Sequence, residues 1–167
     1  MNLSDYRKLI ITWAEDRNLI KGSTPNKQLD KLFEELGEFA GHSARGMKDA
    51  MKDDIGDMFV VLTILSAQLG FEDQEIPSTT EEDLKDLTNA VLYTFMGAVA
   101  AGCALKEYEE VDLQAIETAI FDTIYILQGT AVKLGFNFQE CIAIAWDDIK
   151  DRKGRMVDGV FIKEADL

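Results

Sequence analysis

The sequence contains little proline, and its only two examples, Pro25 and Pro77, stand in polar connecting segments. Between such connectors the chain shows helical periodicity and strong helix formers, with almost none of the alternation that predicts strands. We expect helices near residues 4–18, 26–46, 50–69, 81–106, 113–134 and 138–151. The chain is therefore predicted to be all-α, a helical bundle of about five to six helices.

Long apolar runs are also absent, since no stretch approaches the roughly 20 residues that a membrane span needs. The N-terminal segment MNLSDYRKLI has no basic region followed by an apolar core, so it does not predict a signal peptide. Cysteine is scarce, and Cys103 and Cys141 both fall in helix-like apolar stretches where buried, reduced thiols are expected. Together these features predict a cytoplasmic protein that makes no membrane contact.

Positive charge is scarce as well, because 17 lysine and arginine residues face 31 aspartate and glutamate residues, a net charge of −14. So acidic a surface repels phosphate backbones, and we expect no binding to nucleic acid. A small anionic ligand stays compatible with it if a divalent cation lies between ligand and protein. The length of 167 residues predicts a single domain over residues 1–167.

Two predicted helices end on the same tripeptide, Leu-Gly-Phe, at residues 69–71 and 134–136. A shift of 65 residues aligns residues 57–76 with 122–141 without a gap and with seven identities. A duplicated two-helix unit explains this similarity best, although chance similarity between amphipathic helices is the alternative. The expected organisation is a repeat, a degenerate copy and a basic C-terminal segment, at 26–76, 91–141 and 142–167.

Carboxylates cluster on the second predicted helix. Helical spacings of four, three and four place Lys31, Glu35, Glu38 and His42 on one stripe, with Glu34 beside it. Carboxylates three residues apart repel each other unless a positive charge compensates them. In the degenerate copy Val99, Ala100 and Cys103 stand in place of the three glutamates, so the acids are not required by the repeated scaffold.

A second acidic pair, Asp54 and Asp57, comes directly before the apolar run at residues 58–62. A run so apolar should be buried, and this places Asp57 at the edge of the core. Two acid pairs on consecutive antiparallel helices can converge into four or five oxygen ligands, a set that suits Mg²⁺ or Mn²⁺. A solvated acidic face is the alternative.

The pattern Glu34-Glu35-x-x-Glu38, followed by Asp54-x-x-Asp57, resembles the metal motif of the MazG family. This family belongs to the all-α nucleoside triphosphate pyrophosphohydrolases, together with the dimeric dUTPases and dCTPases. The family usually has glutamate at the first acid of the second pair, so Asp54 shortens one ligand by a methylene. The segment from Trp146 onward, including Val-Asp-Gly-Val-Phe, is similar to the tail of phage and bacterial MazG-like proteins.

The resemblance implies Mg²⁺-dependent hydrolysis of a nucleoside triphosphate to the monophosphate and pyrophosphate, with a dNTP as the expected substrate. A water activated by the metal would attack at the α–β phosphate linkage. The implied metal ligands are Glu35, Glu38, Asp54 and Asp57, with Mn²⁺ as a possible substitute ion. Glu34, Glu35 and Glu38 are the implied catalytic group, in which Glu34 is either a further ligand or the base. Family members form dimers or tetramers, so we expect a homo-oligomer.

The phosphates also need cations. Lys31 shares the acidic stripe. The only dense basic cluster contains Lys150, Arg152, Lys153 and Arg155, and it would suit the leaving pyrophosphate. Complementing a helix dipole is the alternative role of that cluster. Gln28 or Asn18 could read a base edge.

Two other classes of protein are weighed against this enzyme. A di-iron carboxylate bundle needs Glu-x-x-His pairs on two helices, which a single histidine, His42, cannot supply. A non-catalytic nucleotide sensor or assembly module with the same fold stays open because of Asp54. Trp13 and Trp146 are expected to pack in the core rather than stack on a base.

Overall fold

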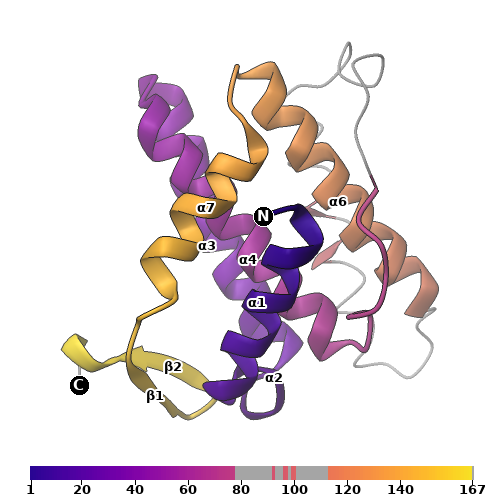
Figure 1. Ribbon diagram of the computed structural model, residues 1–167, viewed down its shortest axis with the longest axis vertical. Helices are drawn as coiled ribbons and strands as arrows, with labels where there is room; N and C mark the ends of the chain where they lie inside the picture. The colour runs from indigo at the N-terminus through magenta and orange to yellow at the C-terminus, as the bar shows by residue number, and fades with distance from the viewer. Residues whose placement is uncertain (78–91, 93–95, 98, 101–112, 167) are drawn as a thin grey trace.

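The computed structural model describes residues 1–77, 92, 96, 97, 99, 100 and 113–166, and these residues form an all-α bundle. Its helices are α1 (Leu3–Asp16), α2 (Leu19–Gly22), α3 (Pro25–Arg45), α4 (Lys48–Gln68), α6 (Leu113–Lys133) and α7 (Phe138–Ile149) (Figure 1). Five predicted helices agree with these bounds to within two residues, while α2 was not predicted. The predicted helix at 81–106 lies almost wholly outside the described residues, and so does much of the degenerate repeat.

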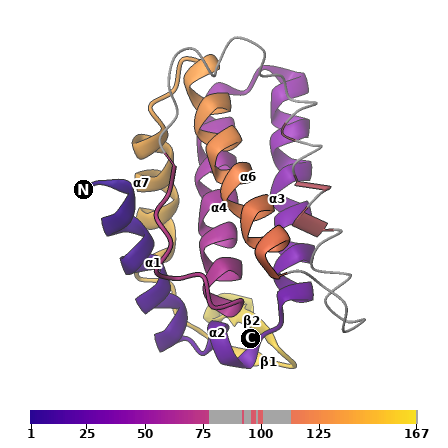
Figure 2. The same cartoon turned by 90° about the vertical axis from the view of Figure 1, so that its right-hand side faces the viewer.

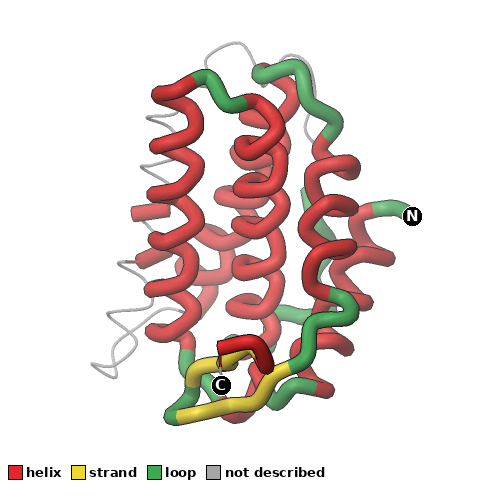
Figure 3. Tube along the Cα trace, turned by 90° about the vertical axis from the view of Figure 1, so that its left-hand side faces the viewer, coloured by secondary structure: helices red, strands yellow, loops and turns green. Residues whose placement is uncertain are grey.

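Helix α4 occupies the centre of the bundle and contacts α1, α2, α3, α6 and α7. Figures 2 and 3 show α3 and α4 side by side and antiparallel, with α7 on the other flank of α4. The run Met58–Leu62 is buried, as its sequence predicts, because α4 has neighbours on nearly every face. None of the described helices combines the length and the apolar character that crossing a bilayer requires.

The start of α3 and the ends of α4 and α6 are set by caps and left-handed glycines. Thr24 caps α3 through a hydrogen bond from the Lys27 amide to its hydroxyl oxygen, 3.3 Å long. After α4 and α6, Gly70 and Gly135 take the left-handed conformation, with φ of 85° and 77°. The amide of the following phenylalanine then donates to a carbonyl in the last helical turn, at 2.9 Å and 2.8 Å. Both ends are therefore Schellman motifs.

A β-hairpin follows α7 at one end of the bundle and was not predicted. Strand β1 (Gly154–Val157) pairs with antiparallel β2 (Val160–Lys163), and a short 3₁₀ helix (Glu164–Asp166) comes after them. Asp158 and Gly159 form the turn with φ of 51° and 78°, the two positive values of a type I′ turn. Figure 3 shows the hairpin lying across the ends of α3, α4 and α7.

Gly56 sets the separation between α4 and α7. A Cβ atom at this position would lie 2.2 Å from the carbonyl oxygen of Cys141 and 2.7 Å from the Cβ of Ala145. Only glycine therefore allows the two helices to approach so closely. This close contact is adjacent in sequence to Asp57 and fixes α7 beside the acidic part of α4.

Candidate functional site

A cleft of about 540 Å³ opens between α3, α4, the C-terminal end of α7 and the β-hairpin. Carboxylates from three helices line it, namely Glu34, Glu35, Glu38, Asp57 and Asp148. Apolar side chains line it as well, and they come from α1, α2, α4, α7 and β2. The cleft is thus partly a charged surface and partly an apolar one.

The glutamates of α3 differ in their exposure. The side chain of Glu35 is only 5% exposed, whereas that of Glu34 is 58% exposed, and Glu38 is also exposed. Lys31 lies one turn earlier, and its Nζ is 3.0 Å from Glu34 Oε2 and 2.5 Å from Glu35 Oε1. Burial raises the pKa of Glu35, the ion pair with Lys31 opposes this, and the charges of Glu38 and Glu34 add to it. A single lysine therefore leaves this group of acids undercompensated.

Asp57 is the strongest sign of a functional site on α4. It is half-buried directly before the buried Met58, which confirms its predicted place at the edge of the core. Burial, together with the charges of Glu35 and Asp53, raises its pKa to about 7. Carboxylates with a pKa this far from the usual range occur mainly at functional sites.

Asp54, the other predicted ligand on α4, points elsewhere. Its side chain is 5% exposed, and its Oδ2 lies 2.8 Å from Nδ1 of His42. It lies outside the set of described residues that line the cleft. Burial raises the pKa of Asp54, His42 partly offsets this, and the charges of Glu38 and Asp53 raise it further. Asp54 is therefore near the acids but already has a partner.

The neighbouring residue, Asp53, was not singled out by the sequence analysis, and like Asp54 it lies outside the described lining of the cleft. Its pKa is raised by burial and then by the charges of Asp148 and Glu38. Carboxylates of α3, α4 and α7 thus act on one another across the site. The spacing of four between Asp53 and Asp57 places them on one face of the helix, and it is the signal that could have revealed Asp53.

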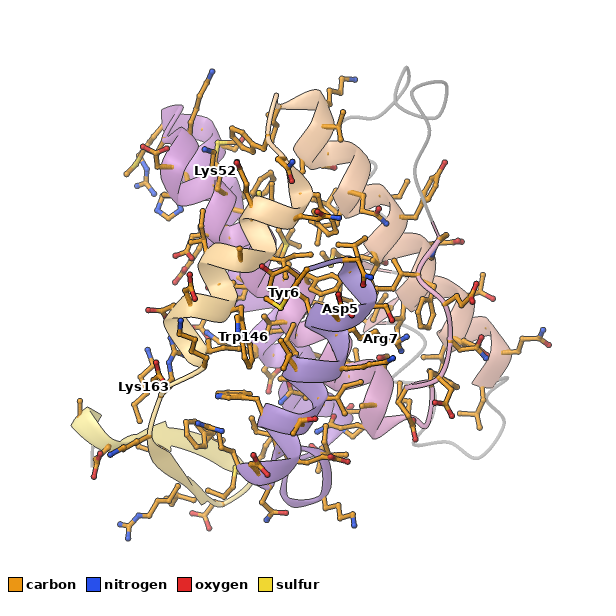
Figure 4. All side chains as sticks on the ribbon, in the orientation of Figure 1. Asp5, Tyr6, Arg7, Lys52, Trp146 and Lys163 are labelled. Carbon is orange, nitrogen blue, oxygen red and sulfur yellow. The ribbon has the colours of Figure 1, made fainter. Side chains whose placement is uncertain are left out.

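Of the predicted cations, Lys31 and Arg152 line the cleft, and Arg152 pairs with Asp148. Lys150 instead pairs with Asp147 at 2.6 Å, and Lys153 lines an adjacent open depression of about 510 Å³. Two cations that were not predicted also line the cleft, Lys27 on α3 and Lys163 on β2. Lys163 is labelled in Figure 4.

Trp13 forms part of the buried wall of the cleft. It is 7% exposed, and its Nε1 donates to the carbonyl oxygen of Ile149 at 2.8 Å. Its ring meets that of Phe161 edge-on, with 6.1 Å between the centroids. The prediction that Trp13 packs in the core is confirmed. Trp146 is half-buried against the core and lies outside the described lining of the cleft.

The acids suit a hard divalent cation by their chemistry and their charge. Carboxylate oxygens are the ligands that Mg²⁺ prefers. The raised pKa values of Glu35 and Asp57 come first from burial and then from the charges of neighbouring acids, and a bound cation would oppose both effects. As the side chains stand, no three carboxylate, imidazole or thiol groups of the described residues are grouped so as to hold one metal ion. The fit to Mg²⁺ therefore rests on the donor set and its charge.

Part of the chain is similar in sequence to a phage protein. The chain is 51% identical over 67 residues to an uncharacterised 18.2 kDa protein from the rep–hol intergenic region of Haemophilus phage HP1. This match covers 40% of the chain and about two fifths of the phage protein's length. No family model matches the chain, and no solved structure matches it.

Proposed function

We propose that this protein hydrolyses a nucleoside triphosphate to the monophosphate and pyrophosphate in a Mg²⁺-dependent reaction, with a dNTP as the expected substrate. The observation that supports this proposal is the shared cleft. Four acids that the MazG-like pattern selects lie in it together with two of the predicted cations, namely Glu34, Glu35, Glu38, Asp57, Lys31 and Arg152.

Charge explains why the substrate would bring a metal with it. A triphosphate is strongly anionic, and the carboxylates of the cleft would repel it if nothing positive lay between them. The residues that would hold Mg²⁺ are Glu35, Glu38 and Asp57, with Asp54 beside them and held by His42. When bound, Mg²⁺ supplies the positive charge that stabilises charge developing on the phosphoryl oxygens.

The protein's own side chains would divide the remaining work. The side chain of Glu34 is 58% exposed, so it can reach the attacking water and accept its proton. Lys31 holds Glu34 and Glu35 by ion pairs and fixes their orientation. Arg152 and Lys163 can donate hydrogen bonds to the outer phosphates and stabilise the leaving pyrophosphate.

The test is pyrophosphate release from the eight common NTPs and dNTPs, with Mg²⁺ and with chelator. We expect release from at least one nucleotide with Mg²⁺, and a fall of about 100-fold or more in Glu38→Ala. Glu140→Ala is the matched control, because Glu140 is exposed on α7 and lies outside the described lining of the cleft. Full activity in chelator, or in Glu38→Ala, would contradict the proposal.

A non-catalytic nucleotide sensor is the second candidate, and Asp54 favours it. Its carboxylate is engaged by His42, so one of the four ligands implied by the family pattern is turned away from the cleft. A sensor would bind a nucleotide with Mg²⁺ and release no pyrophosphate. Equilibrium binding measured beside the release assay separates the two candidates.

The cellular setting belongs to the same proposal. We place the protein in the cytoplasm as a homo-oligomer, a dimer or tetramer, in keeping with the MazG-like pattern. Cys141 is a free, buried thiol whose pKa burial raises to about 11, which suits a reducing compartment. Cys103 lies outside the described residues.

A further inference from the structure

Gln28 is a polar side chain of the cleft that has no role in the site described so far. It lies on the stripe of Lys31 and Glu35, one and two turns before them on α3. It lines the cleft, yet only 6% of the residue is exposed. Within the described part of the chain its carboxamide takes part in no hydrogen bond. The carboxamide atoms of Gln28 are not among the buried polar atoms of the described residues that are cut off from solvent without a partner, so the carboxamide keeps access to the cleft and is available to a bound ligand.

Apolar side chains line the same cleft as Gln28. Leu19 and Ile64 are buried, at 6% and 4% exposure. On strand β2, Phe161 is half-buried and Val160 is 46% exposed even though it lines the cleft. Apolar walls with a few convergent polar groups are typical of a small-molecule site and suit a flat ring that carries a hydrogen-bonding edge.

The turn of the hairpin is held against the start of α3. Lys27, the residue next to Gln28, donates through Nζ to the carbonyl oxygen of Asp158. Gly159 lies so close that a Cβ there would be 2.9 Å from the same Nζ and 3.3 Å from the carbonyl oxygen of Gly22. These contacts bring β2 to the end of the cleft where Gln28 lies.

The distance along α3 fits a nucleotide. Seven residues separate Gln28 from Glu35, which corresponds to about 10 Å of helical rise. A nucleotide with its phosphates at the acids would therefore extend its base toward Gln28. Asn18, the other amide singled out in the sequence, is exposed and lies outside the described lining of the cleft.

We propose that Gln28 and strand β2 form the subsite for the nucleobase, in which the Gln28 carboxamide reads the hydrogen-bonding edge of the base. This inference rests on the proposed function for the phosphate end of the ligand. A carboxamide presents a donor and an acceptor side by side and complements a base edge that presents the reverse pair. Gln28 is thus a specificity-determining residue, and the ligand class is a nucleotide rather than a polyphosphate or a sugar phosphate.

The primary test measures binding and needs no turnover. The probes are AMP, GMP, CMP, UMP and dTMP, compared by calorimetry with ribose 5-phosphate, which lacks the base. We expect at least one monophosphate to bind about 10-fold or more tightly than ribose 5-phosphate, and Gln28→Leu to remove most of that difference. Gln28→Met is a second variant of similar size, and Gln139→Leu on the exposed face of α7 is the matched control.

In turnover, Gln28→Leu should raise KM for the preferred nucleotide by about 10- to 100-fold, change kcat little, and flatten the preference among bases. If no triphosphate is cleaved but monophosphate binding still depends on Gln28, the proposed function fails and the inference stands. If triphosphates are cleaved while both Gln28 variants keep the base preference and KM of the wild type, the inference is overturned and the function stands. Equal binding of ribose 5-phosphate and all five monophosphates also overturns it.

Discussion

Among the carboxylates that line the cleft, Asp57 has the most strongly raised pKa. Its pKa of about 7 lies far above the usual value of 3.8, because burial and the charges of Glu35 and Asp53 disfavour its charged form. The folded state therefore binds a proton that the unfolded state has released between these two pH values. The free energy of unfolding therefore falls as the pH rises through this range. Above pH 7 Asp57 is charged in the folded state as well, and the whole destabilising effect of that charge is present.

We therefore expect Asp57→Asn to raise the free energy of unfolding at pH 8, by up to about 4 kcal/mol, and to change it little at pH 4. Urea denaturation at the two pH values measures the difference. Asp30→Asn is the control, because Asp30 is exposed on α3 and lies outside the described lining of the cleft. A variant that is no more stable than the wild type at pH 8 would show that Asp57 is not strained by its surroundings.

The two aspartates of the sequence motif should differ in their effect on activity. Asp57 lines the cleft, whereas Asp54 is bonded to His42 and lies outside the described lining. We expect Asp57→Asn to reduce kcat/KM for the preferred triphosphate by about 100-fold or more, and Asp54→Asn by about 10-fold, as for a group that orients others. Steady-state kinetics at saturating Mg²⁺ gives both values. Equal losses would mean that Asp54 rotates toward the cleft and binds the metal directly.

At the scale of the helices, one glycine on α4 and one on α3 offer two contrasting test substitutions. Gly56 packs against the backbone of Cys141, while a Cβ at Gly37 would have nothing from the described residues within 4 Å. Gly56→Ala should lower the free energy of unfolding by about 1–3 kcal/mol, because α7 must move away. Gly37→Ala should raise it by about 0.5–1 kcal/mol, because alanine favours the helix. Thermal or urea unfolding of both variants checks the opposite signs.

The helices were predictable because their signals are local and repeated. In α3 the apolar residues recur at helical spacing over 21 residues, α4 contains a long apolar run, and Thr24 and Gly70 mark a start and an end. The hairpin was missed because strands of four residues are too short to show alternation. The Asp158-Gly159 dipeptide was its only local signal.

The site was predictable only where helical spacing determines it. Glu35 and Glu38 share a face by their spacing, and both line the cleft as expected. Asp53 and Asp54 stand four and three residues before Asp57. Since a helical turn takes about 3.6 residues, both spacings place a side chain near that of Asp57, and spacing alone could not decide between the two. Lys27 was missed because its place depends on contact with Asp158, 131 residues away, which no local pattern encodes.

The whole molecule carries a net charge of −14, and its cleft adds a local concentration of negative charge. We expect Mg²⁺ at ten times its dissociation constant to stabilise the fold by about 1.4 kcal/mol at pH 8. The gain should shrink at pH 5, because protons compete for carboxylates whose pKa is raised, Asp57 above all. Differential scanning fluorimetry at both pH values provides the measurement.

General screening of surface charge is the competing explanation for such a shift. NaCl at matched ionic strength is therefore the control, and chelator should reverse the effect of Mg²⁺. Asp57→Asn should lose most of the gain. An equal shift with NaCl would mean that the acids bind no specific cation.

The wall of the cleft joins segments that are far apart in the chain. Trp13 of α1 donates to the carbonyl of Ile149, a separation of 136 residues, and its ring contacts Phe161 of the hairpin. During synthesis, α3 and α4 can pair as soon as both have left the ribosome, but these contacts must wait for residues 149–163. A nascent chain would thus fold its acidic helices well before it had a closed cleft, and the activity we propose would begin only after residues 149–163 have been synthesised.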